Sequence, residues 1–564
     1  MKKLIECVPN FSEGNDMNII NQITAEIEAV DGVKLIDVDP GKATNRTVVT
    51  MVGTPDEVCE AAFRAIKKAA GLIDMTKHKG AHPRFGATDV CPLIPVANII
   101  MDETVEYAHK LAERIGNELQ IPIYCYESAA TEPKRRNLSV CRSGEYEGLK
   151  EKLSNPDWKP DFGPSEFSDK IAKTGVTAVG ARNFLIAYNV NLNTTSTRRA
   201  NAVAFDVRER GRAKVDPKTK KPVFDEKGNK VFAPGLLKSV KAIGWFIEEF
   251  GIAQISMNLT DILITPLHVA FDTVCDRAQA RGLRVSGSEL VGVLPLDAML
   301  EAGRYFLRKQ KRSVGVSDKE LIKIAVKSLG LDELYPFEPD KKIIEYILDN
   351  DAKKGKKQLV DMTLVEFADE TASESPAPGG GSIAAYMGAL GASLGGMVAN
   401  LSSHKRGWDD RWEEFSNHAE KAKHYQTRLL KMVDEDTNAF NKIMDAFGLP
   451  KKSDEEKAIR SKAIQDATKY ATEVPFETMK LCFESMQVMK AMAENGNPNS
   501  VTDAGVGAIA ARAGVLGAFL NVKINAAELA DKSFAADIIN KGDDIMNKTN
   551  QLENDILKIV EGKI

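Results

Sequence analysis

The pattern of hydrophobic positions divides this chain of 564 residues near residue 350. Before that point, short β-branched runs alternate with helical patterns, whereas after it the apolar residues recur almost everywhere at helical spacing. In the first part the pattern predicts strands at 4–8, 33–39, 47–52 and 121–126, and helices at 17–30 and 57–70. This order of strand, helix, two strands, helix and strand is the split βαβ, or ferredoxin-like, arrangement.

A similar pattern recurs after Gly180, with a long strand within 182–192 and further elements at 239–251, 252–263 and 266–281. Segment 223–232 predicts an exposed β-hairpin that turns at Lys227, Gly228 and Asn229. We therefore expect an α+β N-terminal half of two ferredoxin-like subdomains, followed by an all-α C-terminal domain. The predicted boundaries are 1–180, 181–348, a linker at 349–358, and 359–564.

The linker is short and charged, and Gly355 interrupts it. A solvated connection explains such a charge run. The alternative is that its four lysines, at positions 353, 354, 356 and 357, attract an acidic ligand that passes between the domains.

Segment 375–403 contains no charged residue, although 28% of the chain is charged. Its large apolar residues recur at steps of three and four, and small residues occupy the opposite face. The large residues are Ile383, Met387, Leu390, Leu394, Met397 or Val398, and Leu401; the small ones are Gly388, Gly391, Gly395 and Ala399. A lipid-facing helix does not need one face of large residues and an opposite face of small ones. We predict a buried helix whose small face contacts a neighbouring helix, with 503–517 as its partner.

The glycine turn at 376–382 leads directly into this helix. Free N–H groups at a helix N-terminus favour an anion or a polarised carbonyl group. The turn matches neither the G-x-x-x-x-G-K-[ST] phosphate loop nor the G-x-G-x-x-G pattern. A simple tight turn explains it equally well.

Helical phase identifies Asp436 as a candidate catalytic residue. The apolar stripe of 429–447 consists of Leu429, Val433, Phe440, Ile443 or Met444, and Phe447, and Asp436 occupies the position that completes it. Asp434 and Glu435 fall off the stripe, where we expect solvation. Burial raises the pKa of a carboxyl group, and such groups concentrate at functional sites. A hydrogen-bonded structural role is the alternative.

In the N-terminal half the candidate is His82, within HKGAHPRFG. His78 and His82 have metal-ligand spacing, but Gly80 and Pro83 disfavour the helix that would align them, so we expect no metal. A loop histidine beside Lys77, Lys79 and Arg84 suits acid–base chemistry in an anion-binding site. For a single histidine, a structural role has equal weight.

Composition narrows the class of protein. A net charge of −4 gives no general reason to expect nucleic acid. The seven cysteines form no C-x-x-C pair, which argues against a disulfide framework or a zinc site and for a reducing cytosol. The N-terminus lacks the long apolar core of a signal peptide. We expect a cytoplasmic protein that does not enter a membrane.

Long motifs of this chain resemble known folate enzymes. Five motifs of the first half resemble glutamate formimidoyltransferase: LIECVPNFSEG, DVDPGKATNRTVVTMVG, DMTKHKGAHPRFGATDVCPLIPV, WKPDFGPSEF and GARNFLIAYNVNL. Three motifs of the second half resemble formimidoyltetrahydrofolate cyclodeaminase: SPAPGGGSIAA, VDEDTNAF and GAFLNVKINA. The two sets of motifs follow one another in the order of the fused bifunctional family. The resemblance implies transfer of a formimidoyl group from N-formimidoyl-L-glutamate to tetrahydrofolate, then cyclisation to 5,10-methenyltetrahydrofolate with release of ammonia.

The resemblance also implies site residues. The family's catalytic histidine maps onto His82 and its cyclodeaminase aspartate onto Asp436. The transferase folate segment maps onto 163–175, and the glycine turn is expected to line the cyclodeaminase folate site. The residues in these two segments are Gly163, Pro164, Ser165, Glu166, Phe167, Gly175, Gly379, Gly380, Gly381 and Ser382.

From charge matching, we expect Asp39 to orient His82, and Arg46 and Arg84 to bind the carboxylates of formimidoylglutamate. The family resemblance implies tetrahydrofolate, as a polyglutamylated co-substrate, and a homo-octamer. Two alternatives stay open: a C-terminal half that acts mainly as methenyltetrahydrofolate cyclohydrolase, and a non-catalytic folate-binding scaffold. Retention of both His82 and Asp436 counts against the scaffold.

Overall fold

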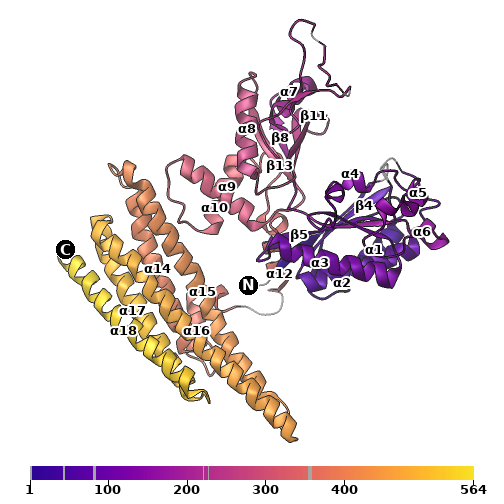
Figure 1. The fold of residues 1–564 in the computed structure, drawn as a ribbon. Coiled ribbons are helices and arrows are strands. Elements are labelled where there is room, and N and C mark those ends of the chain that lie inside the picture. The colour runs from indigo at the N-terminus through magenta and orange to yellow at the C-terminus, as the bar shows by residue number, and fades with distance from the viewer. Residues whose placement is uncertain (1–2, 42–44, 81–83, 220, 227, 353–357) are drawn as a thin grey trace. The chain divides into compact units, whose positions relative to one another are not determined.

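The computed structural model describes residues 3–41, 45–80, 84–219, 221–226, 228–352 and 358–564. It forms two compact units, one of Met1–Met299 and Leu329–Asp351 and the other of Leu300–Ser328 and Ala352–Ile564. The first unit contains mixed α/β sheets and the second is helical, so the predicted fold class is confirmed at this level (Figure 1). Segment Leu300–Ser328 belongs to the helical unit, although it precedes the predicted linker.

The first sheet has seven strands: β1 Leu4–Cys7, β2 Asn10–Phe11, β3 Val33–Gly41, β4 Arg46–Gly53, β5 Thr88–Ala97, β6 Ile123–Glu127 and β7 Thr177–Ala181. β1 and β2 both lie between β4 and β5, antiparallel to each, while β3 pairs with β4. β7 lies between β5 and β6 and runs parallel to both. Helices α1 Met17–Glu28, α2 Pro55–Leu72 and α3 Met101–Arg114 cover one face (Figure 1).

Two elements in the middle of this subdomain were not predicted. Strand β5 and helix α3 lie between the expected helix at 57–70 and the expected strand at 121–126. β5 contains Pro92 and Pro95, residues that ordinarily disfavour a central strand. The register of β1 against β5 shifts beside Pro95, so the sheet accommodates this proline with an irregularity.

The second sheet contains β8 Ile186–Leu192, β11 Val240–Ile247, β12 Ile252–Leu259 and β13 Val285–Val291, in the spatial order β11-β12-β8-β13. All its pairs are antiparallel, and α7 Thr197–Val207 and α8 Leu267–Gln279 pack on it. The predicted hairpin is present between β9 Arg212–Ala213 and β10 Phe232–Ala233, where Phe224 pairs with Lys230. Lys227, at its predicted turn, lies outside the described residues.

Shorter helices complete the first unit and lead into the second. They are α4 Leu138–Cys141, α5 Leu149–Ser154, α6 Asp169–Thr174, α9 Leu296–Lys309, α10 Asp318–Leu329, α11 Pro339–Lys342 and α12 Ile344–Ala352. The helical unit then contains α13 Leu364–Thr371, α14 Gly380–Ser403, α15 Trp412–Gly448, α16 Asp454–Asn495, α17 Val501–Ala527 and α18 Lys532–Glu561.

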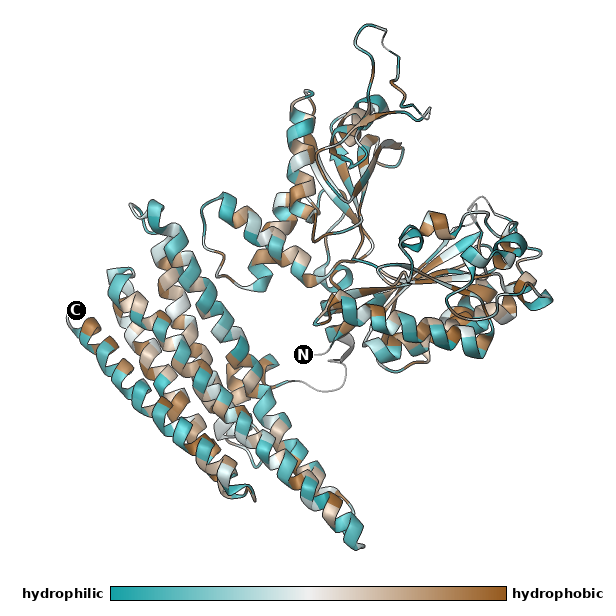
Figure 2. Ribbon diagram, in the orientation of Figure 1, coloured by the Kyte–Doolittle hydropathy of each residue, from teal (hydrophilic) through white to brown (hydrophobic). Residues whose placement is uncertain are grey.

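Helix α14 packs closely on α17 through small residues, as predicted. A Cβ on Gly391 would lie 2.7 Å from the carbonyl oxygen of Gly507, and one on Gly514 would lie 2.8 Å from that of Ala384. Figure 2 shows the middle of the helical unit mostly white to brown and the far ends of its long helices teal. Backbone contact at this range requires glycine.

The large apolar residues of α14 lie on its exposed side. Leu390, Met397 and Leu401 are exposed, as are Ile509, Leu520 and Ile524 of α17. Gly380–Ser403 and Pro498–Ala527 are both long and apolar enough to cross a membrane, with 61% and 50% of their most apolar windows buried. The helix is therefore buried mainly through its small face, with Val398 as a large residue that is also buried.

Candidate active sites

In the helical unit, the carboxyl group of Asp436 on α15 lies against the first turn of α14. The hydroxyl of Ser382 donates to Asp436 Oδ2 at 3.0 Å and to the carbonyl oxygen of Val433 at 2.9 Å. A Cβ on Gly381 would overlap this carboxyl group, 2.5 Å from its Cγ. Glycine at 381 is therefore what allows Asp436 to approach the helix terminus.

Burial raises the pKa of Asp436, and hydrogen bonds from the side chain and backbone of Ser382 partly offset that effect. Among the described residues, no cationic side chain pairs with this carboxyl group. A group in these surroundings retains its proton to higher pH than an ordinary aspartate does, so it can serve as a general acid.

Only part of the predicted apolar stripe is buried. Leu429 and Val433 lie in the core, whereas Phe440, Met444 and Phe447 are exposed. The later turns of α15 are buried through other residues, because Ala439 packs against Ala471 and Val474 of α16. Asp436 thus lies at the end of the buried stripe rather than in its middle.

The two acidic neighbours of Asp436 were expected to be solvated, and both have protein partners instead. Asp434 Oδ1 accepts a hydrogen bond from the backbone N–H of Leu359 at 2.7 Å, and Glu435 accepts one from the hydroxyl of Tyr470. Helical phase places a side chain on a face, but it cannot show that a distant segment or helix supplies a partner there.

The glycine turn belongs to the same site. Gly379 is the N-cap of α14, and a Cβ on Gly380 would lie 3.3 Å from the side-chain amide of Asn521 on α17. Helices α14, α15 and α17 thus bring Gly380, Ser382, Asp436 and Asn521 together. Asn521 was not predicted, although an amide inside the apolar GAFLNVKINA was a visible signal.

In the α/β unit, the predicted His82 lies outside the described residues, so only the flanks of its loop are visible. Arg84 donates to the carbonyl oxygen of His78 and to Glu147, and its guanidinium lies 5.1 Å from the ring centre of Tyr146. On the other flank, His78 Nε2 is 2.8 Å from the carbonyl oxygen of Asn45. Both ends of the loop are therefore anchored.

Asp39 and Arg46 lie on the same face of the first sheet. Asp39 pairs with Val48 and Gly41 with Arg46, which places both side chains on the face opposite α1, α2 and α3. Asn10 is on the other side of Val48, in the same row as Asp39. The strand register thus brings two predicted residues and one unpredicted amide together.

A buried charge cluster adjoins Arg46. Its Nη1 is 3.7 Å from Asp89 Oδ2, and Arg142 also pairs with that oxygen. The Asp89 side chain is 1% exposed, and burial raises its pKa to about 6 although both arginines lower it. Asp89 and Arg142 were not predicted, because their 53-residue separation leaves no local pattern.

Glu6 is a second unpredicted carboxyl group on this face. It pairs across the sheet with Val52 and Ile94 and is 5% exposed. Burial raises its pKa to about 7, and the positive charge of Arg182 opposes that rise. A charged residue inside the apolar strand LIEC was a signal that could have identified it.

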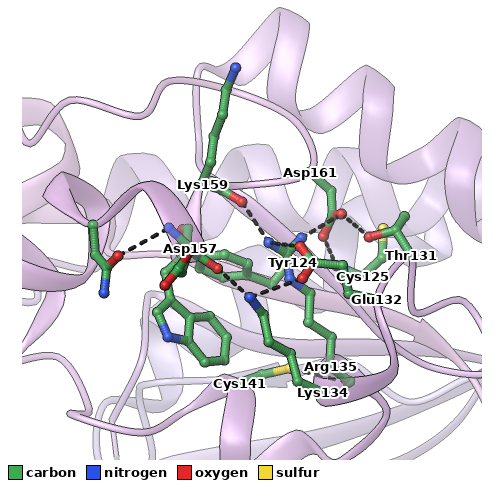
Figure 3. A network of polar contacts seen from close by, with 12 residues as sticks. Tyr124, Cys125, Thr131, Glu132, Lys134, Arg135, Cys141, Asp157, Lys159 and Asp161 are labelled. Carbon is green, nitrogen blue, oxygen red and sulfur yellow. Dashed lines mark hydrogen bonds and ion pairs between the residues drawn. The ribbon is translucent and has the colours of Figure 1, made fainter.

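The chain just before the predicted folate segment is attached to the edge strand β6 by a polar network (Figure 3). Asp161 Oδ2 accepts a hydrogen bond from the backbone N–H of Cys125 at 2.7 Å, and Oδ1 pairs with the buried Arg135 at 2.6 Å. Arg135 also donates to the carbonyl oxygen of Lys159 at 2.8 Å. This network fixes the start of segment 163–175.

The two glycines of the segment have structural roles. Gly163 has a φ of +82°, and a Cβ there would overlap the carbonyl oxygen of Ile121. Gly175 has a φ of +65° and forms a bridge with Gly86, next to the loop that carries His82. Between them Pro164 and Ser165 are half-buried and Glu166 and Phe167 are exposed.

Comparison with known proteins agrees with this organisation. Residues 4–182 match the family described as formiminotransferase domain, N-terminal subdomain, and residues 187–349 match the formiminotransferase domain. Residues 363–544 match the family described as formiminotransferase-cyclodeaminase.

Curated relatives cover both the whole chain and its halves. A formimidoyltransferase-cyclodeaminase of Gallus gallus is 43% identical over 95% of this chain and 94% of its own length. A glutamate formimidoyltransferase of Streptococcus pyogenes serotype M1 is 41% identical over 55% of this chain and 94% of its own. A methenyltetrahydrofolate cyclohydrolase of Methylorubrum extorquens is 38% identical over 36% of this chain and 97% of its own.

Proposed function

The chain belongs to the formimidoyltransferase-cyclodeaminase family, and we propose that it catalyses two consecutive folate reactions of histidine degradation. The first transfers the formimidoyl group of N-formimidoyl-L-glutamate to N5 of tetrahydrofolate and releases glutamate. The second closes the ring from N10 onto the formimidoyl carbon, expels ammonia and yields 5,10-methenyltetrahydrofolate. Relatives named for the fused enzyme and for the transferase alone support this division of labour.

The observation that carries the second step is the Asp436 carboxyl group, raised in pKa by burial and free of a cationic partner among the described residues. Ammonia leaves an amidine carbon poorly unless the departing nitrogen is protonated. A carboxylic acid that keeps its proton to higher pH than an ordinary aspartate supplies that proton. Ser382 and the glycine turn position the acid, and the turn together with the α14 N-terminus faces the folate.

For the first step, His82 takes the proton of N5 as this nitrogen attacks, and returns it to the departing glutamate nitrogen. Asp39 orients or charges this histidine, while Arg46 and Arg84 bind the two substrate carboxylates. The shared face of Asp39 and Arg46 and the anchored flanks of the loop support these roles. Binding through Arg84 requires exchange of its partner Glu147, whose side chain is 61% exposed.

The finer architecture belongs to the same proposal. Each sheet has the strand order expected of a ferredoxin-like subdomain, with β3-β4-β1-β5 in the first and β11-β12-β8-β13 in the second. Tetrahydrofolate is the co-substrate, with a polyglutamate tail, and its transferase contacts come from 163–175. The protein acts in the cytoplasm.

The homo-octamer implied by the family has support in the helical unit. Five large residues of α14 follow the spacing of a coiled-coil seam: Met387, Leu390, Leu394, Met397 and Leu401. Helix α17 also presents exposed apolar residues. A second copy of the chain is the occupant we propose for this surface. Light scattering of Leu390→Lys and Leu401→Lys variants tests it: smaller assemblies support the proposal, and an unchanged mass contradicts it.

One relative favours a second candidate activity for the helical unit. The Methylorubrum protein that aligns with it is named a methenyltetrahydrofolate cyclohydrolase. Both reactions act on the same carbon between N5 and N10. Purified protein offered 5-formimidoyltetrahydrofolate and 5,10-methenyltetrahydrofolate in separate assays distinguishes them by which substrate it consumes faster.

Paired variants test the main proposal. Asp436→Asn is expected to consume formimidoylglutamate at the normal rate, accumulate 5-formimidoyltetrahydrofolate and release ammonia about 100-fold or more slowly. His82→Asn is expected to lose transfer and still cyclise 5-formimidoyltetrahydrofolate supplied directly. Unimpaired ammonia release by the first variant, or near-normal transfer by the second, contradicts the corresponding role.

A further inference from the structure

A strongly basic cluster lies on α7 and the segment that follows it, remote in sequence from both catalytic residues. Between positions 198 and 214 the chain carries six basic residues, Arg198, Arg199, Arg208, Arg210, Arg212 and Lys214, against the two acidic residues Asp206 and Glu209. The chain as a whole has a net charge of −4. Neither proposed activity uses this cluster.

Part of the cluster lines a cavity of about 600 Å³. Four arginines reach it, Arg198, Arg199, Arg212 and Arg281, together with Asn201 and the ring of Phe205. This volume lies within the range of small-molecule sites and is too small for a nucleic-acid duplex. The cavity therefore fits a compact ligand rather than a broad basic surface.

The internal ion pairs leave most of this positive charge uncompensated. Asp206 accepts from Arg212 at 2.8 Å and from Arg281 Nε at 2.9 Å, so one carboxylate serves two guanidinium groups. Arg198 and Arg199 form no ion pair among the described residues, and both are exposed. Four arginines against one aspartate leave three positive charges around the cavity.

Helix polarity makes the arrangement costly without a ligand. Arg198 and Arg199 lie in the first turn of α7, which contains no acidic residue and where the helix dipole disfavours positive charge. At the other end of α7, the pKa of Arg208 is lowered by burial and by the positive charges of Arg210 and Arg212, and Arg212 also lines the cavity. An anion in the cavity relieves this repulsion and meets the free N–H groups of the turn as well.

The cavity is also pre-organised. The Asn201 side chain donates to the carbonyl oxygen of Gly244 at 2.9 Å and accepts from its N–H at 3.0 Å, which fixes α7 onto β11. The backbone carbonyl oxygens of Ala202 and Arg281 accept from Arg212 at 2.7 Å and from Arg199 at 3.3 Å. Guanidinium groups held in this way keep free N–H edges for oxyanions.

We propose that this cavity binds a compact ligand with at least two carboxylate or phosphate groups. The arginines would recognise paired oxyanions that match their spacing. Either an oligocarboxylate such as a γ-glutamyl chain or an inorganic polyphosphate supplies such groups. The proposal depends on neither catalytic activity.

Calorimetric titration of the full-length protein tests it, with tetra-γ-glutamate and tripolyphosphate as separate probes. At least one is expected to bind saturably, with affinity that falls as salt concentration rises. The double variant Arg198→Gln/Arg199→Gln is expected to bind that probe at least tenfold more weakly. The control Lys451→Gln/Lys452→Gln removes the same charge from an exposed pair elsewhere and should bind normally.

Thermal unfolding separates loss of binding from loss of fold. Without probe, the arginine variant should unfold at or above the wild-type midpoint temperature, because repulsion at α7 is removed. With probe, the midpoint temperature should rise only for the wild type and the control. Tetra-γ-glutamate binding alone identifies an oligocarboxylate site, and tripolyphosphate binding alone a phosphate site. Equal affinity of the arginine variant, absence of saturable binding by both probes, or a changed assembly mass in that variant overturns the proposal.

Discussion

The two candidate sites give a buried carboxyl group different partners. In the α/β unit, Asp89 is buried between the guanidinium groups of Arg46 and Arg142. In the helical unit, the hydrogen bonds of Asp436 come from Ser382, and its pKa is raised with no cation beside it. Burial raises the pKa of both groups, to about 6 for Asp89, but two cations oppose that rise in Asp89 and only hydrogen bonds oppose it in Asp436. The first arrangement suits binding and the second suits proton donation.

The largest difference should appear in stability. Asp89→Asn leaves two arginines without their shared carboxylate, and we expect the α/β unit to lose about 3–5 kcal/mol. Asp436→Asn removes no ion pair and should cost the helical unit less than about 1 kcal/mol. Urea unfolding of both variants at pH 7, followed by circular dichroism and tryptophan fluorescence, checks this. Equal losses would show that the two carboxyl groups are held alike.

Next in size is the effect of Gly381→Ala on the cyclodeaminase step. The new methyl group would displace the Asp436 carboxyl group, and we expect ammonia release to fall about 100-fold. Transfer should be unaffected. Gly395→Ala on the same helix is the control, because its Cβ meets Val488 at an ordinary 3.4 Å. Normal ammonia release by Gly381→Ala would remove the steric argument for this glycine.

The α/β sheet also contains a carboxyl group that resembles Asp436 more than Asp89. The pKa of Glu6 in the folded chain is about 7, above its ordinary 4.5. The folded state therefore binds this proton more tightly, and stability is lost as the pH rises from 4.5 to about 7. Glu6→Gln should reduce the stability lost between pH 5 and pH 8 by up to about 3 kcal/mol.

Urea unfolding of the α/β unit at both pH values measures that loss. Glu28→Gln, on the exposed side of α1, is the control and should leave the pH dependence unchanged. If Glu6→Gln behaves like this control, the Glu6 carboxyl group is solvated in the folded chain.

The smallest expected effect is on the pH profile of cyclisation. The Ser382 hydroxyl stabilises the ionised form of Asp436, so its removal in Ser382→Ala raises the pKa of the acid further. The alkaline limb of ammonia release should then move to higher pH, with a loss of about fivefold or less at the optimum. Ser393→Ala on the same helix is the control. An acid limb that moves to higher pH, with the alkaline limb unmoved, would show that Asp436 acts as a base.

Local patterns predicted much of the fold and identified a candidate residue in each unit. The small face of α14 and its partner α17 follow from glycine spacing, because backbone approach depends on the absence of Cβ atoms. Asp436 follows from helical phase, since an acid interrupted an otherwise apolar stripe. Strand β5 did not follow, because its two prolines oppose a central strand locally while β1, β2 and β7 pair with it from both sides.

The sequence by itself determined the division into α/β and helical parts and the family to which the chain belongs. It also identified Asp436 as the candidate acid, because helical periodicity and long motifs are local properties. Only the tertiary structure decided that the large side of α14 faces outward, that Asp89 lies between Arg46 and Arg142, and that Ser382 and Gly381 support Asp436. Each of these depends on segments distant in sequence that fold against one another, where partners and burial set the chemistry of a residue.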